Sequence, residues 1–139
     1  MRIDVGQPDA CDVGWFVARQ PAVVRYFEQQ CGTSDAFPVA LEAAYVICRA
    51  IEAVDGVPVV PVPWKLLDRA GESLDMEALV PGGARDGCAD RQPELCDWVG
   101  KLLANPPIPL HEYEARLVGI CLTTLIYAVD ELTTGRQVP

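Results

Sequence analysis

One stretch near the end of the chain decides the fold: Leu117-Val-Gly-Ile-Cys-Leu-Thr-Thr-Leu-Ile-Tyr-Ala-Val129. It is apolar almost all round, and carboxylates lie on both sides of it, Glu114 before and Asp130 after. A helix without a polar face must be buried on most sides. The stretch is too short to cross a bilayer, which takes about 20 apolar residues. It therefore predicts a buried central helix over 112–132 in an all-α domain.

Helical patterns fill most of the remaining chain, and glycine or proline separates them. The clearest one runs over 38–54, where apolar residues recur at three- and four-residue steps. Gly71 is expected to stop a short helix that begins at Trp64, and Ser73 to cap the next one. Further helices are predicted over 12–19, 21–30 and 93–103. We expect a compact orthogonal bundle of five to seven helices around the C-terminal helix, with residues 1–139 forming one helical domain.

Two connections are stiffened by proline, Val57-Pro-Val-Val-Pro-Val-Pro-Trp64 and Asn105-Pro-Pro-Ile-Pro109. A proline restricts the residue before it to extended geometry. The first connection contains a P-x-x-P pattern, which aromatic grooves of other proteins can bind. Its valines favour packing into the chain's own core, however, so we predict a buried extended crossing with at most one short strand over 57–62. Pro81-Gly-Gly-Ala-Arg-Asp-Gly87 is the expected mobile loop.

The composition limits the classes of function. The chain of 139 residues carries 20 acidic and 11 basic residues, a formal net charge of -9. Half of its residues are hydrophobic, which argues against general disorder of the chain. The basic residues are scattered, whereas a surface that binds phosphates needs clustered lysine and arginine. The composition therefore predicts a folded domain that does not bind nucleic acid directly.

Six cysteines raise the question of disulfides. The first nine residues are polar and do not resemble a signal peptide. In the cytoplasm thiols stay reduced, and Cys48 and Cys121 fall in apolar helical stretches, where cysteine behaves as a small hydrophobe. We therefore expect a cytoplasmic protein with reduced thiols and no membrane segment.

Metal and catalytic sites find little support in the sequence. Cys88, Cys96 and His111 are the residues that could hold zinc, but the two cysteines are eight residues apart. Structural zinc sites use pairs two to four residues apart. His111 is the only histidine, and Glu112 beside it could tune it, yet no nucleophile is tied to it. We expect no metal, no cofactor and no enzymatic activity.

The aromatic residues near the N-terminus give a further indication, although most aromatic side chains of a small domain are expected to belong to its core. Trp15, Phe16 and Phe37 are candidate interface residues, because tryptophan and tyrosine are enriched at interface hot spots and aromatics at interfaces generally. The lack of a convergent polar site and the acidic residues spread over a helical chain favour a non-enzymatic protein–protein interaction module: a small acidic adaptor, assembly factor, immunity protein or inhibitor. Its partner would be another protein or a second copy of the chain.

Three alternatives remain open from the sequence. The first is an acidic inhibitor that mimics nucleic acid, which would need carboxylates arrayed in rows on one face. The second is a small metal-binding protein or enzyme that uses His111 with Cys88 or Cys96. The third is a ligand-binding bundle with an apolar cavity beside Tyr45 or Tyr127.

Overall fold

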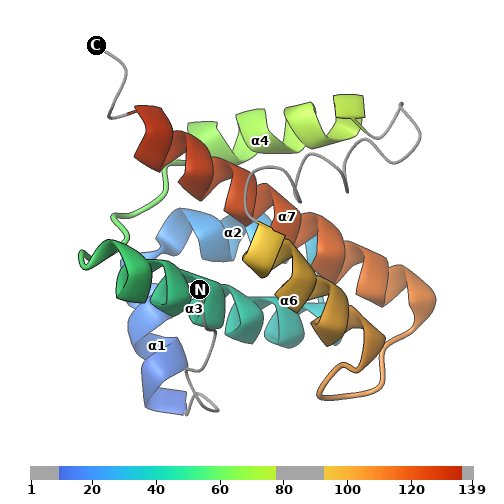
Figure 1. Ribbon diagram of the computed structural model, residues 1–139. Helices are drawn as coiled ribbons and strands as arrows, with labels where there is room; N and C mark the ends of the chain where they lie inside the picture. The colour runs from blue at the N-terminus through green and yellow to red at the C-terminus, as the bar shows by residue number, and fades with distance from the viewer. Residues whose placement is uncertain (1–9, 78–92, 136–139) are drawn as a thin grey trace.

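The computed structural model describes residues 10–77 and 93–135, and the regular secondary structure of this part of the chain is all helical, without a strand (Figure 1). Its six helices pack against one another, which confirms the predicted all-α bundle. They are α1 (Ala10–Arg19), α2 (Pro21–Cys31), α3 (Ala36–Asp55), α4 (Trp64–Glu77), α6 (Pro93–Ala104) and α7 (Glu112–Gly135).

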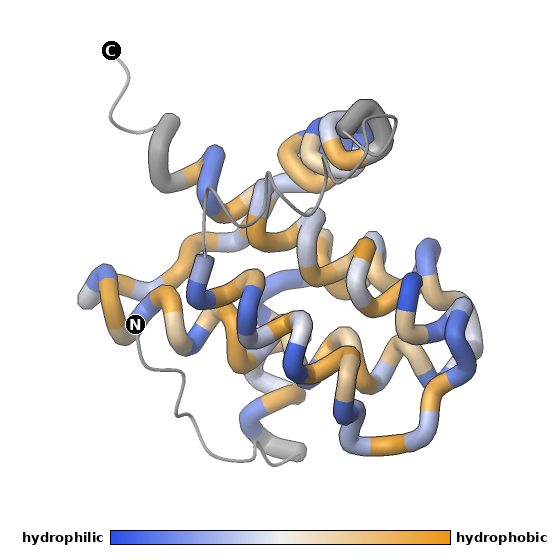
Figure 2. The backbone as a smooth tube through the Cα atoms, turned by 45° about the vertical axis from the view of Figure 1, so that its right-hand side comes forward, coloured by the Kyte–Doolittle hydropathy of each residue, from blue (hydrophilic) through white to orange (hydrophobic). Residues whose placement is uncertain are grey.

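Helix α7 is the centre of the bundle, as the sequence predicted. It contacts α2, α3, α4 and α6 (Figure 1). Between Cys121 and Val129 every residue is buried except Thr123, which is half-buried. Burial on all sides explains why this segment has no polar face. The other helices alternate hydrophobic and hydrophilic stretches, as expected of helices that cover a core (Figure 2).

Helix α3 is the second main element, and it contacts α1, α2 and α7. It extends the predicted helix over 38–54 by two residues at its start and one at its end. It ends at Gly56, whose left-handed φ of 76° suits a residue without a Cβ. The Gly56 N–H donates to the carbonyl of Glu52 and closes the last turn. This end of α3 leads into the proline-rich connection.

The prediction that Gly71 ends a helix is wrong, and so is the separate helix starting at Ser73. Helix α4 continues through Gly71 to Glu77. A Cβ added at Gly71 would lie 2.6 Å from the hydroxyl oxygen of Tyr26 on α2. The glycine is therefore explained by the close approach of α2 to α4, not by a helix stop.

The connection from α3 to α4 crosses the bundle without regular secondary structure over 57–63. Val59 and Val62 are buried, as predicted, whereas Val57 and Val60 are exposed, so the prediction of a buried crossing is wrong for these two valines. The predicted loop over 81–87 lies outside the described residues. Among the helices that are described, none is both long enough and apolar enough to cross a membrane.

Candidate functional site

Buried residues of the proline-rich connection are three positions apart. Val59 and Val62 point into the core, whereas Pro58, Val60 and Pro61 are exposed. A strand would alternate every two residues, and a repeat of three is that of the polyproline II helix. Residues that precede proline are already restricted to this extended region. The connection therefore presents one valine face to the core and a proline ridge to solvent.

Gln20, between α1 and α2, holds this connection in place. Its side chain is buried, with 3% of the residue exposed. The amide Nε2 donates to the carbonyl of Val60 at 3.1 Å, and Oε1 accepts the N–H of Val62 at 2.8 Å. The connection has no regular secondary structure that would pair its backbone groups. The glutamine amide therefore supplies the partners that its backbone would otherwise lack.

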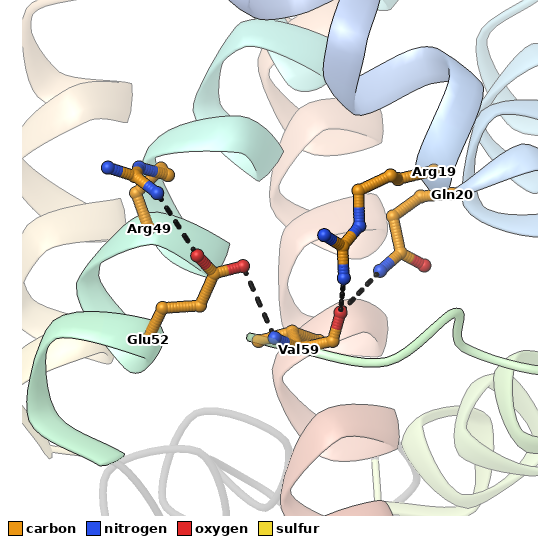
Figure 3. Close-up of polar contacts among 5 residues, drawn as sticks. All are labelled: Arg19, Gln20, Arg49, Glu52 and Val59. Carbon is orange, nitrogen blue, oxygen red and sulfur yellow. Dashed lines mark hydrogen bonds and ion pairs between the residues drawn. The ribbon is translucent and has the colours of Figure 1, made fainter. Parts of the chain in front are cut away.

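Val59 is held from two sides, as Figure 3 shows. Its N–H donates a hydrogen bond to Oε1 of Glu52 on α3 at 3.2 Å, and its carbonyl oxygen accepts a hydrogen bond from Nη2 of Arg19 at 3.3 Å. The second carboxylate oxygen of Glu52 accepts a hydrogen bond from Nη1 of Arg49 at 3.2 Å. The connection is thus fixed by α3 on one side and by the junction of α1 and α2 on the other.

Arg19 links this connection to an exposed tryptophan. Its guanidinium carbon lies 4.8 Å from the centroid of the Trp15 ring, within the range of a cation–π contact. Trp15 is 47% exposed, and Val57 and Val60 are also exposed hydrophobic residues. Arg19 thus contacts both Trp15 and the carbonyl of Val59, and we call Trp15, Arg19 and the exposed residues around Val59 the Trp15 edge. Its members are Trp15, Arg19, Val57, Pro58, Val60 and Pro61.

The three aromatic residues predicted as an interface occupy different environments. Trp15 is exposed, whereas Phe16 is 2% exposed and contacts Tyr45 edge-to-face, with ring centroids 6.2 Å apart. Phe37 is half-buried and packs against the core. Of the three residues, Trp15 has the largest exposed fraction and is therefore the one that a partner could contact most extensively. The sequence prediction missed Arg19, although its position four residues after Trp15 places both on one helix face.

The residues proposed for a metal or catalytic site do not form a described cluster. His111 is exposed and stacks on Tyr113, with ring centroids 5.9 Å apart. Cys96 is half-buried on α6, and Cys88 lies outside the described residues. Glu112 pairs with Arg116 one turn further along α7. Within residues 10–77 and 93–135, no group of three or more His, Cys, Asp and Glu side chains could hold a metal ion.

No protein-family model, curated protein or solved structure matches this chain. Its side-chain chemistry and geometry are therefore the basis on which a function is inferred.

Proposed function

We propose that this protein is a non-enzymatic protein-interaction module that binds its partner through the Trp15 edge. One observation carries the proposal: Arg19 joins an exposed tryptophan to a connection with exposed valines, whose backbone Gln20 and Glu52 hold in place. Tryptophan and arginine are enriched among residues that dominate binding energy. A segment that is ordered before binding loses little conformational entropy when a partner covers it.

The exposed residues of the Trp15 edge also indicate what kind of partner would bind it. Pro58 and Pro61 lie three residues apart on the exposed side of the connection. Grooves lined by aromatic side chains bind proline residues at this spacing. The partner would therefore be another protein with an apolar, aromatic groove. A second copy of this chain is the alternative partner, and the oligomeric state distinguishes the two. We place this activity in the cytoplasm and assign it no cofactor.

Affinity capture from the native host tests the proposal, with substitutions in the Trp15 edge and at a control position far from it. Trp15→Ala and Val60→Asp change the edge, which lies beyond the C-terminal end of α3. Tyr113→Ala is the control, because Tyr113 is also an exposed large side chain. It neighbours Glu114, which bonds to Asp35 at the opposite end of α3, about 30 Å away for a helix of this length. Light scattering on each purified protein reports self-association.

The expected result is a stoichiometric partner that the wild type and Tyr113→Ala capture equally. Trp15→Ala and Val60→Asp should each weaken its binding at least tenfold, as substitution of a central interface residue does. A partner lost only with Tyr113→Ala would move the interface to the other end of the molecule. A monomer that captures no protein would reject the proposed function itself.

A further inference from the structure

Two buried cysteines that are distant in the sequence meet between α2 and α7. Cys31 is the last residue of α2, and Cys121 lies in the middle of α7, 90 positions later. Their sulfur atoms are 3.7 Å apart, and the two residues are 6% and 0% exposed. Both are free thiols. From the contact between these sulfurs we propose that Cys31 and Cys121 form an oxidation site, at which a peroxide converts the two thiols to a disulfide.

The geometry needs only a small movement. A disulfide joins its sulfurs at about 2.05 Å, so the two atoms must approach by about 1.7 Å. Cys121 is held in the central helix, but Cys31 lies at a helix end, where backbone positions adjust most easily. Gly32 follows it with a φ of 61°, and Gly32 and Thr33 are exposed. Movement at the end of α2 can therefore close the distance while the core around α7 stays in place.

The two thiols differ in chemical character. The two thiols share a hydrogen bond in which either sulfur can be the donor. This contact lowers the pKa of Cys31 and raises that of Cys121, with burial adding to the rise. A thiolate is the form of cysteine that attacks an oxidant. Cys31 also lies at a helix end beside the exposed Gly32 and Thr33, whereas Cys121 is 0% exposed in the central helix. Cys31 is therefore the attacking residue and Cys121 the resolving one.

The reaction proceeds in two balanced steps. The Cys31 thiolate attacks one oxygen of hydrogen peroxide, the O–O bond breaks, and the departing hydroxide takes up a proton to become water. Cys31 is then a sulfenic acid. The Cys121 sulfur, as it loses its proton, attacks the Cys31 sulfur and displaces the hydroxyl group, which leaves as a second water. The protein loses two hydrogen atoms, and one peroxide is reduced to two waters.

The other described cysteines make suitable controls. Cys48 is buried on α3, where burial raises its pKa to about 12, and it is expected to stay a thiol. Cys96 on α6 is half-buried. The site is independent of the Trp15 edge, so its failure would leave the proposed function standing, and the reverse also holds.

The test is to treat the full-length reduced protein with one equivalent of hydrogen peroxide and then map its peptides by mass spectrometry. We expect two of the six thiols to disappear, the mass to fall by two hydrogen atoms, and one crosslink to join Cys31 to Cys121. Dithiothreitol should reverse the change. The crosslink should persist in Cys48→Ala and Cys96→Ala and be lost in Cys31→Ala and Cys121→Ala.

Thermal unfolding provides a second measurement, since a crosslink that closes a long loop restricts the unfolded chain. The oxidised wild type should unfold at a higher temperature than the reduced form, and peroxide should give Cys31→Ala no such increase. Mapping of the wild type needs no variant to fold. A wild type that gains oxygen without a crosslink, keeps all its thiols, or pairs Cys31 with another cysteine would overturn the proposal.

Discussion

The carboxylate of Glu114 on α7 accepts the backbone N–H of Asp35, the residue before α3, with 3.1 Å between the nitrogen and Oε2. Its other oxygen, Oε1, accepts the N–H of His111 at 3.0 Å, at the start of its own helix. The first N–H groups of a helix have no partner within it. A glutamate at the third helical position often caps its own helix in this way. Here one buried side chain serves two helix starts and ties α7 to α3.

Removing one of these acceptors should destabilise the fold. Glu114→Gln keeps the size of the side chain but replaces one acceptor oxygen with an NH₂ group, so one of the two N–H groups loses its partner. An unsatisfied buried group costs about 1–3 kcal/mol, and urea unfolding should show a loss of this size. The control is Glu112→Gln, whose exposed side chain pairs with Arg116 at 3.6 Å and should change stability by less than about 0.5 kcal/mol. Equal effects at Glu112 and Glu114 would contradict the double cap.

The contact between Gly71 and Tyr26 predicts opposite effects for two glycine-to-alanine substitutions. Gly100→Ala, at an exposed position with open space around it, should stabilise α6 by about 0.5–1 kcal/mol. Gly71→Ala gains the same helix propensity, but its Cβ would lie 2.6 Å from the Tyr26 hydroxyl. Tyr26 also packs against Trp64, with ring centroids 5.7 Å apart, so it cannot move freely. Overpacking costs about 1–3 kcal/mol, and a net loss should appear in thermal unfolding.

A double-mutant cycle identifies the cause of that loss. Tyr26→Phe removes the hydroxyl, and the next atom near the added Cβ is the ring carbon Cζ at 3.7 Å, an ordinary contact distance. In this background Gly71→Ala should be neutral or stabilising. If the same loss persisted without the hydroxyl, the close approach of α2 would not be the reason for Gly71.

The sequence predicted the helices whose pattern lies within their own residues. It failed where a residue far away in the chain determines the local structure. The apolar segment of α7 allowed only burial, so the central helix could be predicted. Gly71 is a different case, because a glycine at a helix end and a glycine under a neighbouring side chain look alike in sequence. The reason for this one is Tyr26, 45 positions earlier. Trp15 and Phe16 are neighbours on one helix and point in different directions, and their order does not show which is buried.

At the candidate site, too, the sequence predicted some features and missed those that depend on distant residues. The valines of the proline-rich connection predicted its burial, and this was confirmed at Val59 and Val62. The exposed ridge of Pro58 and Pro61 follows from the three-residue repeat of the backbone, which the sequence alone did not establish. Gln20 could not be predicted as its anchor, because a glutamine about 40 positions away carries no signal of its partners.

Substitution of Gln20 should both destabilise the fold and loosen the connection. Gln20→Ala leaves the buried N–H of Val62 and the carbonyl of Val60 without their partner, at a cost of about 1–3 kcal/mol for each group that stays unsatisfied. Amide hydrogen exchange at Val62 should become faster. Gln20→Glu keeps an acceptor for Val62 but loses the donor to Val60, so it should protect the Val62 amide better than alanine does. Gln29→Ala, at an exposed position on α2, is the control. Unchanged exchange at Val62 in Gln20→Ala would show that the glutamine does not hold the segment.

The Cys48 thiol should make stability depend on pH in the alkaline range. Burial raises its pKa from 9.0 to about 12, and the carboxylate of Glu52 adds to the shift. In the unfolded chain the thiol loses its proton near pH 9, whereas the folded protein keeps it. The unfolded state therefore binds fewer protons between pH 9 and pH 12, and stability falls as the pH rises through this window. The slope approaches about 1.4 kcal/mol per pH unit.

Urea unfolding at several pH values, for the wild type and Cys48→Ala, isolates this contribution. Alanine lowers stability at pH 8 by leaving a cavity, but it removes the titrating thiol. The difference in stability between wild type and variant should shrink by about 2 kcal/mol between pH 8 and pH 10.5, because each pKa unit corresponds to about 1.4 kcal/mol. Cys96→Ala, at a half-buried position, should keep the wild-type slope, since the Cys48 thiol is still present. Parallel curves for the wild type and Cys48→Ala would mean that the thiol titrates alike in the folded and unfolded chains, and this would contradict its burial on α3.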